Sequence, residues 1–136
     1  MVPAVTIDSV LAGARARSKV YIKVDTQGYE RHVIAGGQYF LSNSSRWVIK
    51  LEFTPRLLQL HGTDPVVFLQ EMVKRLRTVE LPARARFKRD TLSELLEEPV
   101  ALEDCAAFSE YIRALAHGDE GYCDLILLPP NQRSAN

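Results

Sequence analysis

One short stretch, residues 20–30, constrains the fold more than any other part of the chain. It reads Val-Tyr-Ile-Lys-Val-Asp-Thr-Gln-Gly-Tyr-Glu, so an apolar strand pattern ends on Asp25, turns at Gly28 and continues into a helical pattern. Strands and helices that alternate in this way form parallel sheets joined by helical crossovers. Because ligands of such sheets bind beyond the carboxyl ends of the strands, Asp25 is the first candidate for a functional residue.

The rest of the chain continues this alternation and predicts an α/β fold. A second strand is expected over residues 47–53, where Pro55 then prevents its continuation. The clearest helix begins after Asp64, an N-cap residue followed by Pro65, and its apolar residues recur at helical spacing through Arg77. The other expected elements are a turn entering a short helix at 6–14 (capped by Asp8 or Ser9), a helix at 28–35, a short turn at 38–41, strands at 78–81 and 84–88, helices at 91–98 and 103–116, and a last strand at 122–128.

Size, charge and cysteine content restrict the possible functions. We expect one domain over residues 1–130 and a flexible tail over 131–136, because 136 residues is the size of a single domain. The 17 acidic and 17 basic side chains cancel, which argues against a nucleic-acid or membrane-surface partner. No apolar run approaches the roughly 20 residues that cross a bilayer, and residues 1–5 lack the basic start of a signal peptide. With only Cys105 and Cys123, we expect buried, reduced thiols in a cytoplasmic protein.

Two strands each carry a lysine and an acid on the same face. Side chains alternate along a strand, so Lys23 shares a face with Asp25, and Lys50 shares one with Glu52. If the strands are neighbours, these four groups converge at one end of the sheet. Two interpretations stay open: a cross-strand ion network, or a crevice in which Asp25 and Glu52 bind a substrate hydroxyl, a cofactor amine or a hard cation. No Cys/His set has the spacing of a metal site, and we expect no metal.

Three further polar residues accompany this pair. Gln27 lies just beyond the strand end, where its amide can bind a ligand or bridge two loops. Glu30 falls in a first helical turn, where the helix dipole alone favours an acid. His61 is placed in the loop after the second strand and is the only plausible general base, although an exposed loop histidine is the simpler interpretation.

A basic segment near the middle of the chain suggests a different function. Its cations are Lys74, Arg75, Arg77, Arg84, Arg86, Lys88 and Arg89. Such a stripe can bind phosphate or nucleic acid. The acidic residues that follow it, between positions 90 and 104, favour internal charge compensation instead.

Several of these sequence motifs together resemble those of a known family. Residues 22–30, the run Val33-Ile34-Ala35-Gly36-Gly37 and the strand Ile49-Lys50-Leu51-Glu52-Phe53 are similar to the FkbM-like family of S-adenosylmethionine-dependent methyltransferases, and the likeness extends from about Thr6 to Leu128. The resemblance implies half of a doubly wound, Rossmann-like sheet with a C-terminal antiparallel strand. It also implies O-methyl transfer from S-adenosylmethionine to a small-molecule hydroxyl.

The resemblance assigns roles to the candidate residues. In the family, the position of Asp25 lies close to the methyl-transfer centre, and Gln27, Glu30 and Glu52 would shape the same pocket. The catalytic candidates are therefore Asp25, Glu52 and His61, and the substrate-binding candidates are Thr26, Gln27, Glu30 and Phe53.

The family's first strand and glycine-rich cofactor turn are expected to precede Met1. The sequence has no GxGxxG, so the cofactor-binding residues are unknown and we expect weak cofactor affinity. The strand at Val20–Asp25 would then have an open edge, which predicts a homo-oligomer, a partner chain that pairs there, or a cover formed by the N-terminal segment. A non-catalytic binding or assembly module derived from the methyltransferase fold is the alternative function.

Overall fold

The computed structural model of the chain describes four segments, residues 2–14, 18–81, 98–115 and 121–130. Several predicted features lie outside the described residues: the strand at 84–88 with its arginines, nearly all of the helix at 91–98, the end of the helix at 116 and the tail at 131–136. Within the described segments, no helix combines the length and the hydropathy that crossing a bilayer requires.

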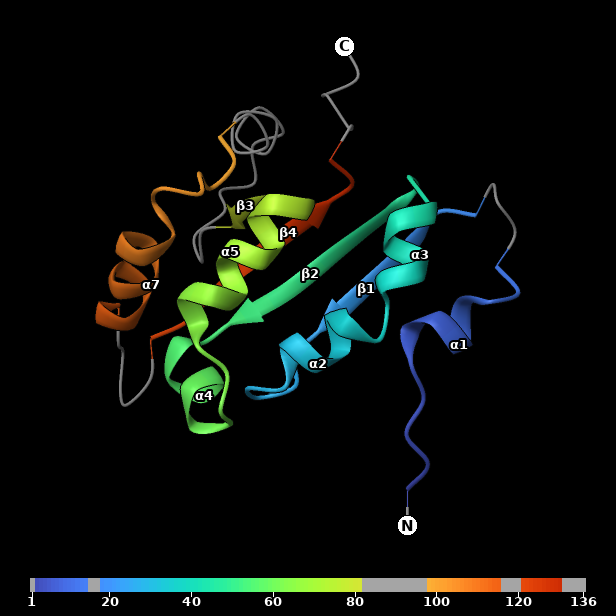
Figure 1. The fold of residues 1–136 in the computed structure, drawn as a ribbon, viewed down its shortest axis with the longest axis horizontal. Helices are drawn as coiled ribbons and strands as arrows, with labels where there is room; N and C mark the ends of the chain where they lie inside the picture. The colour runs from blue at the N-terminus through green and yellow to red at the C-terminus, as the bar shows by residue number, and fades with distance from the viewer. Residues whose placement is uncertain (1, 15–17, 82–97, 116–120, 131–136) are drawn as a thin grey trace.

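A four-stranded sheet in the order β1-β2-β4-β3 forms the centre of the described structure (Figure 1). Strand β1 (Val20–Val24) pairs in parallel with β2 (Trp47–Phe53). The last strand, β4 (Cys123–Leu128), lies between β2 and β3 (Arg77–Leu81) and runs antiparallel to both. The predicted α/β class is confirmed, because this arrangement corresponds to one half of a Rossmann-like sheet with an antiparallel C-terminal strand.

Helices connect the strands and cover one face of the sheet, as Figure 1 shows for α2, α3 and α5. They are α1 (Ile7–Leu11), α2 (Glu30–Ala35), α3 (Gln38–Asn43), α4 (Pro55–Leu60), α5 (Pro65–Arg75) and α7 (Cys105–Ala114). Helix α5 begins as predicted, because the Asp64 carboxylate accepts hydrogen bonds from the N–H groups of Val66 and Val67.

Three details of the helices differ from the sequence predictions. The N-cap of helix α1 is Thr6, and Ser9 completes a capping box by accepting a hydrogen bond from the Thr6 N–H. Asp8 does not cap this helix and instead accepts hydrogen bonds from the N–H groups of Tyr39 and Phe40. Helix α4 was not predicted: Pro55 ends β2 and also occupies the first turn of a new helix, where its missing N–H has no cost. Helix α5 ends two residues early because Leu76 is already extended before β3.

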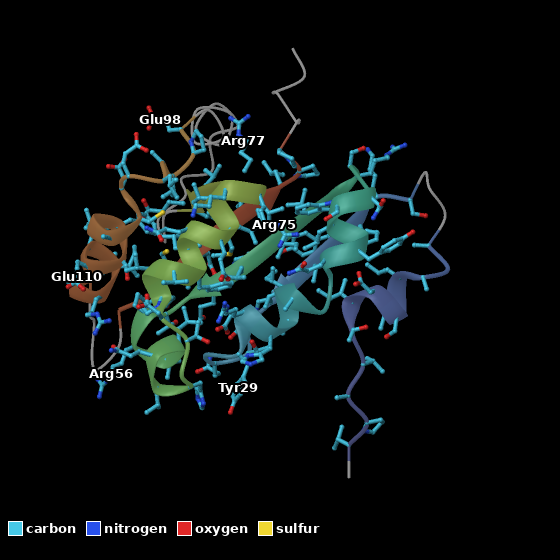
Figure 2. The ribbon with its side chains drawn as sticks, viewed as in Figure 1. Tyr29, Arg56, Arg75, Arg77, Glu98 and Glu110 are labelled. Atoms are coloured by element: carbon cyan, nitrogen blue, oxygen red, sulfur yellow. The ribbon has the colours of Figure 1, made fainter. Side chains whose placement is uncertain are left out.

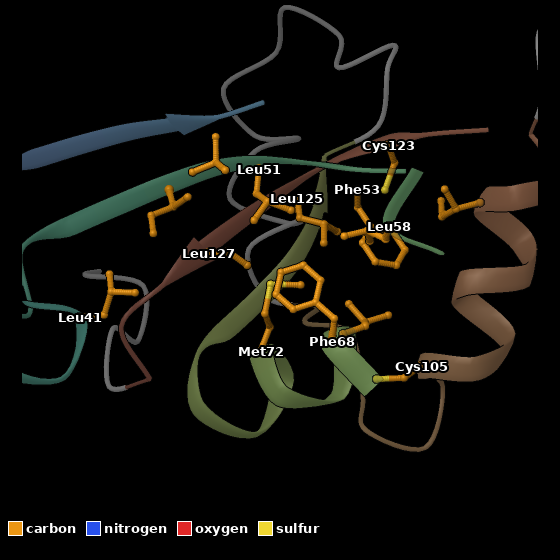
Figure 3. Packing of buried hydrophobic residues seen from close by; sticks show 14 of the residues in the cluster. Leu41, Leu51, Phe53, Leu58, Phe68, Met72, Cys105, Cys123, Leu125 and Leu127 are labelled. Atoms are coloured by element: carbon orange, nitrogen blue, oxygen red, sulfur yellow. The ribbon is translucent and has the colours of Figure 1, made fainter. Parts of the chain in front are cut away.

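The core lies between the sheet and these helices (Figure 3). Burial alternates along β2, so Trp47, Ile49, Leu51 and Phe53 face the helices. Phe68, Leu69 and Met72 of α5 and the inward residues of β4 meet them, and each such buried side chain stabilises the fold by about 1.5–3 kcal/mol. The intervening residues of β1 and β2, among them Lys23, Lys50 and Glu52, therefore lie on the opposite face.

Candidate functional site

Asp25 and Glu52 lie at adjoining ends of two parallel strands. Val24 of β1 is in register with Leu51 of β2, so the next residue of each strand is an acid. The side-chain amide of Gln27 joins them, because its Nε2 donates to Oδ1 of Asp25 at 3.1 Å and to Oε1 of Glu52 at 3.4 Å. The convergence expected from the strand faces is therefore present, with Gln27 as its bridge.

The loop between β1 and α2 holds Gln27 in an unusual backbone conformation. Gln27 has φ +55°, a left-handed conformation that non-glycine residues seldom adopt, and Gly28 follows with φ +103°. A Cβ atom on Gly28 would lie 2.5 Å from the carbonyl oxygen of Leu57 and 2.6 Å from Cδ2 of His61. Glycine is required here because the loop packs directly against the end of α4.

Glu30 supports this loop from within the protein. Its side chain is only 2% exposed. One oxygen accepts hydrogen bonds from the N–H and the hydroxyl of Thr26, at 2.9 and 3.0 Å, and the other accepts one from the N–H of Gly28 at 3.0 Å. Although Glu30 also occupies the first turn of α2, its contacts are to the loop that carries Gln27.

The two carboxylates at the strand ends differ in their electrostatics. Hydrogen bonds from Gln27 and from the Lys23 ammonium, 3.2 Å away, lower the pKa of Asp25. Partial burial and the nearby charge of Asp25 raise the pKa of Glu52, against a smaller opposing effect of the Thr54 hydroxyl, which donates to Glu52 at 3.2 Å. A pair of acids whose pKa values are driven apart is an arrangement suited to acid–base chemistry.

Of the two lysines on this face, only Lys23 forms an ion pair with one of the strand-end acids. Lys50 forms its ion pair with Asp124 of β4 at 3.0 Å, and this hydrogen bond and charge raise the pKa of Lys50. Sequence reasoning missed Asp124, because only the antiparallel register of β2 with β4 brings it opposite Glu52. Among the described residues Glu52 has no ion pair, so its charge is compensated less than that of Asp25.

His61 and Phe53 lie outside this hydrogen-bonded group. The expected loop position of His61 is corrected, because α4 intervenes and His61 ends that helix. Its exposed ring lies beside the β1–α2 loop, 4.4 Å from the ring centre of Tyr29. Phe53 is fully buried and packs against Phe108, on the sheet face opposite Glu52. Within the described residues, no three His, Cys, Asp or Glu side chains are placed to hold a metal ion.

A comparison with known protein families identifies the family of the chain that carries this site. Residues 1–87 match the methyltransferase FkbM domain. The chain belongs to the FkbM methyltransferase family. No curated protein and no solved structure matches it significantly. The resemblance found in the sequence is therefore confirmed for residues 1–87, and its expected continuation to Leu128 stays a prediction. The Asp25–Gln27–Glu52 group lies within the matched residues.

Methyltransferases of this kind use S-adenosylmethionine. Glycines with open space beside them would let such a cofactor approach the backbone closely. Among the described glycines of the matched residues, the space beside Gly28 is filled by Leu57 and His61 and that beside Gly37 by Ile7, whereas Gly13 and Gly62 have open space beside them. Gly28 and Gly37 therefore offer no backbone that a cofactor could approach closely.

Proposed function

We propose that the chain carries the acceptor side of an S-adenosylmethionine-dependent O-methyltransferase, in which a small-molecule hydroxyl binds between Asp25, Gln27 and Glu52. Membership of the FkbM family supports methyl transfer in general. The observation that carries the finer proposal is the single amide that joins two carboxylates at adjoining ends of parallel strands. A hydroxyl both donates and accepts hydrogen bonds, so it can replace Gln27 at Glu52 while it accepts from the freed amide.

The two acids have different roles in this proposal. Asp25 stays ionised because Gln27 and Lys23 favour its charged form, and by accepting a hydrogen bond from the Gln27 amide it orients that amide toward the hydroxyl. Glu52 exchanges a proton more readily near neutral pH because its pKa is raised, and it takes the hydroxyl proton as a general base. The longer of the two Gln27 contacts, 3.4 Å, is the one to Glu52, and it is the contact that a substrate displaces.

The other candidate residues take supporting positions. Thr26 and Glu30 maintain the loop, and His61 with Tyr29 forms an exposed wall beside it. Phe53 contributes through the core. The proposal concerns acceptor binding and proton removal.

Acceptor binding is tested by following the side-chain amide signals of Gln27 by nitrogen-15 NMR during titration with glycerol, a monosaccharide and phenol. We expect at least one of these compounds to shift the Gln27 signals, and the shift to be lost in Asp25→Asn and Glu52→Gln variants. The proposal fails if none of the three perturbs Gln27, or if both variants respond as the parent protein does.

A non-catalytic assembly module is the second candidate, and the position of β1 favours it. Strand β1 is an edge of the described sheet, so one side of its backbone is not paired with another described strand. A second copy or a partner chain could add a strand there. Calorimetric titration with S-adenosylhomocysteine separates the candidates: binding heat supports the methyltransferase, whereas no heat together with a dimer in sedimentation velocity supports the module.

We also propose a reducing compartment, the cytoplasm, for this protein. Cys105 and Cys123 are both free and buried. Burial raises the pKa of each thiol, which keeps both in the unreactive protonated form. Thiol titration of protein isolated under non-reducing conditions should find two free thiols only after unfolding.

A further inference from the structure

A groove lies at the opposite end of the sheet from Asp25 and Glu52. This groove has a volume of about 970 Å³ and runs between α2–α3 and α5. Ser44 and Ser45, which precede β2, and Leu76, which precedes β3, line one end of it, so it opens near the amino ends of these strands. The groove is therefore separate from the acid pair at the carboxyl ends.

The floor of the groove is apolar. Its apolar side chains come from both sides of the groove: Ile34, Leu41, Phe68, Met72 and Leu76. The volume lies within the range of roughly 300–1,000 Å³ that is typical of small-molecule sites. Leu41, Phe68 and Met72 are nearly buried, whereas Ile34 and Leu76 are partly exposed. A ligand with an aliphatic or aromatic body would remove the exposed part of this surface from water, which favours binding by about 25 cal/mol for each Å² buried.

The rim of the groove is basic on the α5 side. Arg31 of α2 is compensated by Glu71 of α5, with which it forms an ion pair at 2.6 Å. Lys74 and Arg75 follow at the end of α5, and Arg75 lies between α5 and α3 (Figure 2). Both are exposed and have no ion pair or hydrogen bond within the described part of the chain. The groove therefore combines an apolar floor with two positive charges that have no ion-pair partner among the described residues.

We propose that this groove binds a single-chain aliphatic carboxylate, with its chain along the floor and its head group on Lys74 and Arg75. The planar guanidinium of Arg75 matches a carboxylate in two parallel hydrogen bonds, and Lys74 adds a second positive charge. A cationic amphiphile with the same chain meets like charge at the rim and is excluded. This site is independent of the proposed acceptor site and stands whether or not the chain transfers methyl groups.

The chain offers a convenient probe of the groove, because its only methionines are Met1 and Met72. Protein labelled with carbon-13 in the methionine methyl groups is titrated with sodium decanoate and, separately, with decyltrimethylammonium, both below their micellar concentrations. We expect decanoate to shift the Met72 signal with saturation and the ammonium compound to leave it unchanged. An unshifted Met72 signal with decanoate, or equal shifts with both amphiphiles, overturns the proposal.

A pair of charge reversals tests the rim. The double variant Lys74→Glu/Arg75→Glu should bind decanoate at least about tenfold more weakly, a loss of about 1.4 kcal/mol. Lys19→Glu, an exposed change before β1 that does not line the groove, is the matched control and should bind as the parent does. Circular dichroism checks that both variants are folded. A double variant that is folded and retains the parent affinity contradicts the assignment of the head group to Lys74 and Arg75.

Discussion

The carboxylate of Glu30 accepts a hydrogen bond from the N–H of Gly28 at 3.0 Å, two residues before it in the chain. With the two bonds from Thr26, this contact fixes the loop whose central residue, Gln27, joins the two strand-end acids. The geometry of the candidate site therefore depends on a buried residue that need not touch a ligand.

Replacement of Glu30 should destabilise the fold by more than replacement of an exposed carboxylate in a first helical turn would. In Glu30→Gln one acceptor oxygen becomes an amide NH2 group, a donor that faces backbone donors, and a buried group left without a partner costs about 1–3 kcal/mol. Urea unfolding should show a loss of this size. Glu110→Gln, a mostly exposed change on α7, is the control and should alter stability by less than about 1 kcal/mol. Equal effects of the two changes would count against the proposed support of the loop.

Alanine variants at two glycines distinguish the cost of backbone strain from the cost of a steric clash. Gly62 has φ +78° with open space around it, so Gly62→Ala should cost about 1 kcal/mol from conformation alone. Gly28→Ala adds a clash with the Leu57 carbonyl, and overpacking of this kind costs roughly 1–3 kcal/mol more. Thermal unfolding of both variants compares them directly. If the Gly28 variant is no less stable than the Gly62 variant, the close packing of the loop on α4 is wrong.

Neutralising the two acids should change stability in opposite directions at neutral pH. Glu52 has a raised pKa, so its ionisation disfavours the folded state, and this cost develops as pH rises from its usual pKa of 4.5 through the folded value. Glu52→Gln should therefore be more stable than the parent at pH 7 and approach it below pH 4.5.

Asp25→Asn should be less stable at pH 7. The pKa of Asp25 is lowered from its usual 3.8, so its contribution is present above 3.8 and is lost as pH falls through the folded value. Chemical unfolding of the parent and both variants at several pH values checks these signs. A change in stability of the same sign in both variants at pH 7 would contradict the assigned electrostatics.

The sequence predicted the main elements and the acid pair because these depend on local patterns. Alternation along each strand places Lys23 with Asp25 and Lys50 with Glu52, and a strand–helix–strand unit makes the two strand ends coincide. Alternation also places Phe53 on the face opposite Glu52, whereas the resemblance to the FkbM family suggested a binding role for it.

Other features depend on relationships that no local pattern contains. The ion pair of Lys50 with Asp124 requires the last strand to lie beside β2, and strand order is a property of the whole sheet. The buried contacts of Glu30 depend on the left-handed conformation of Gln27, which the Gln-Gly pair alone does not specify. Helix α4 was missed because Pro55 serves both as the end of a strand and as the start of a helix.

The most direct test of the account is a pH titration of the side-chain carboxyl carbons of Asp25 and Glu52 by carbon-13 NMR, in the parent protein and in Asp25→Asn. We predict that Asp25 titrates below its usual range and Glu52 above its own, and that the midpoint of Glu52 falls when the charge of Asp25 is removed. Titration of both groups at ordinary values, with Glu52 unaffected by the change at Asp25, would show that the two acids do not form one site.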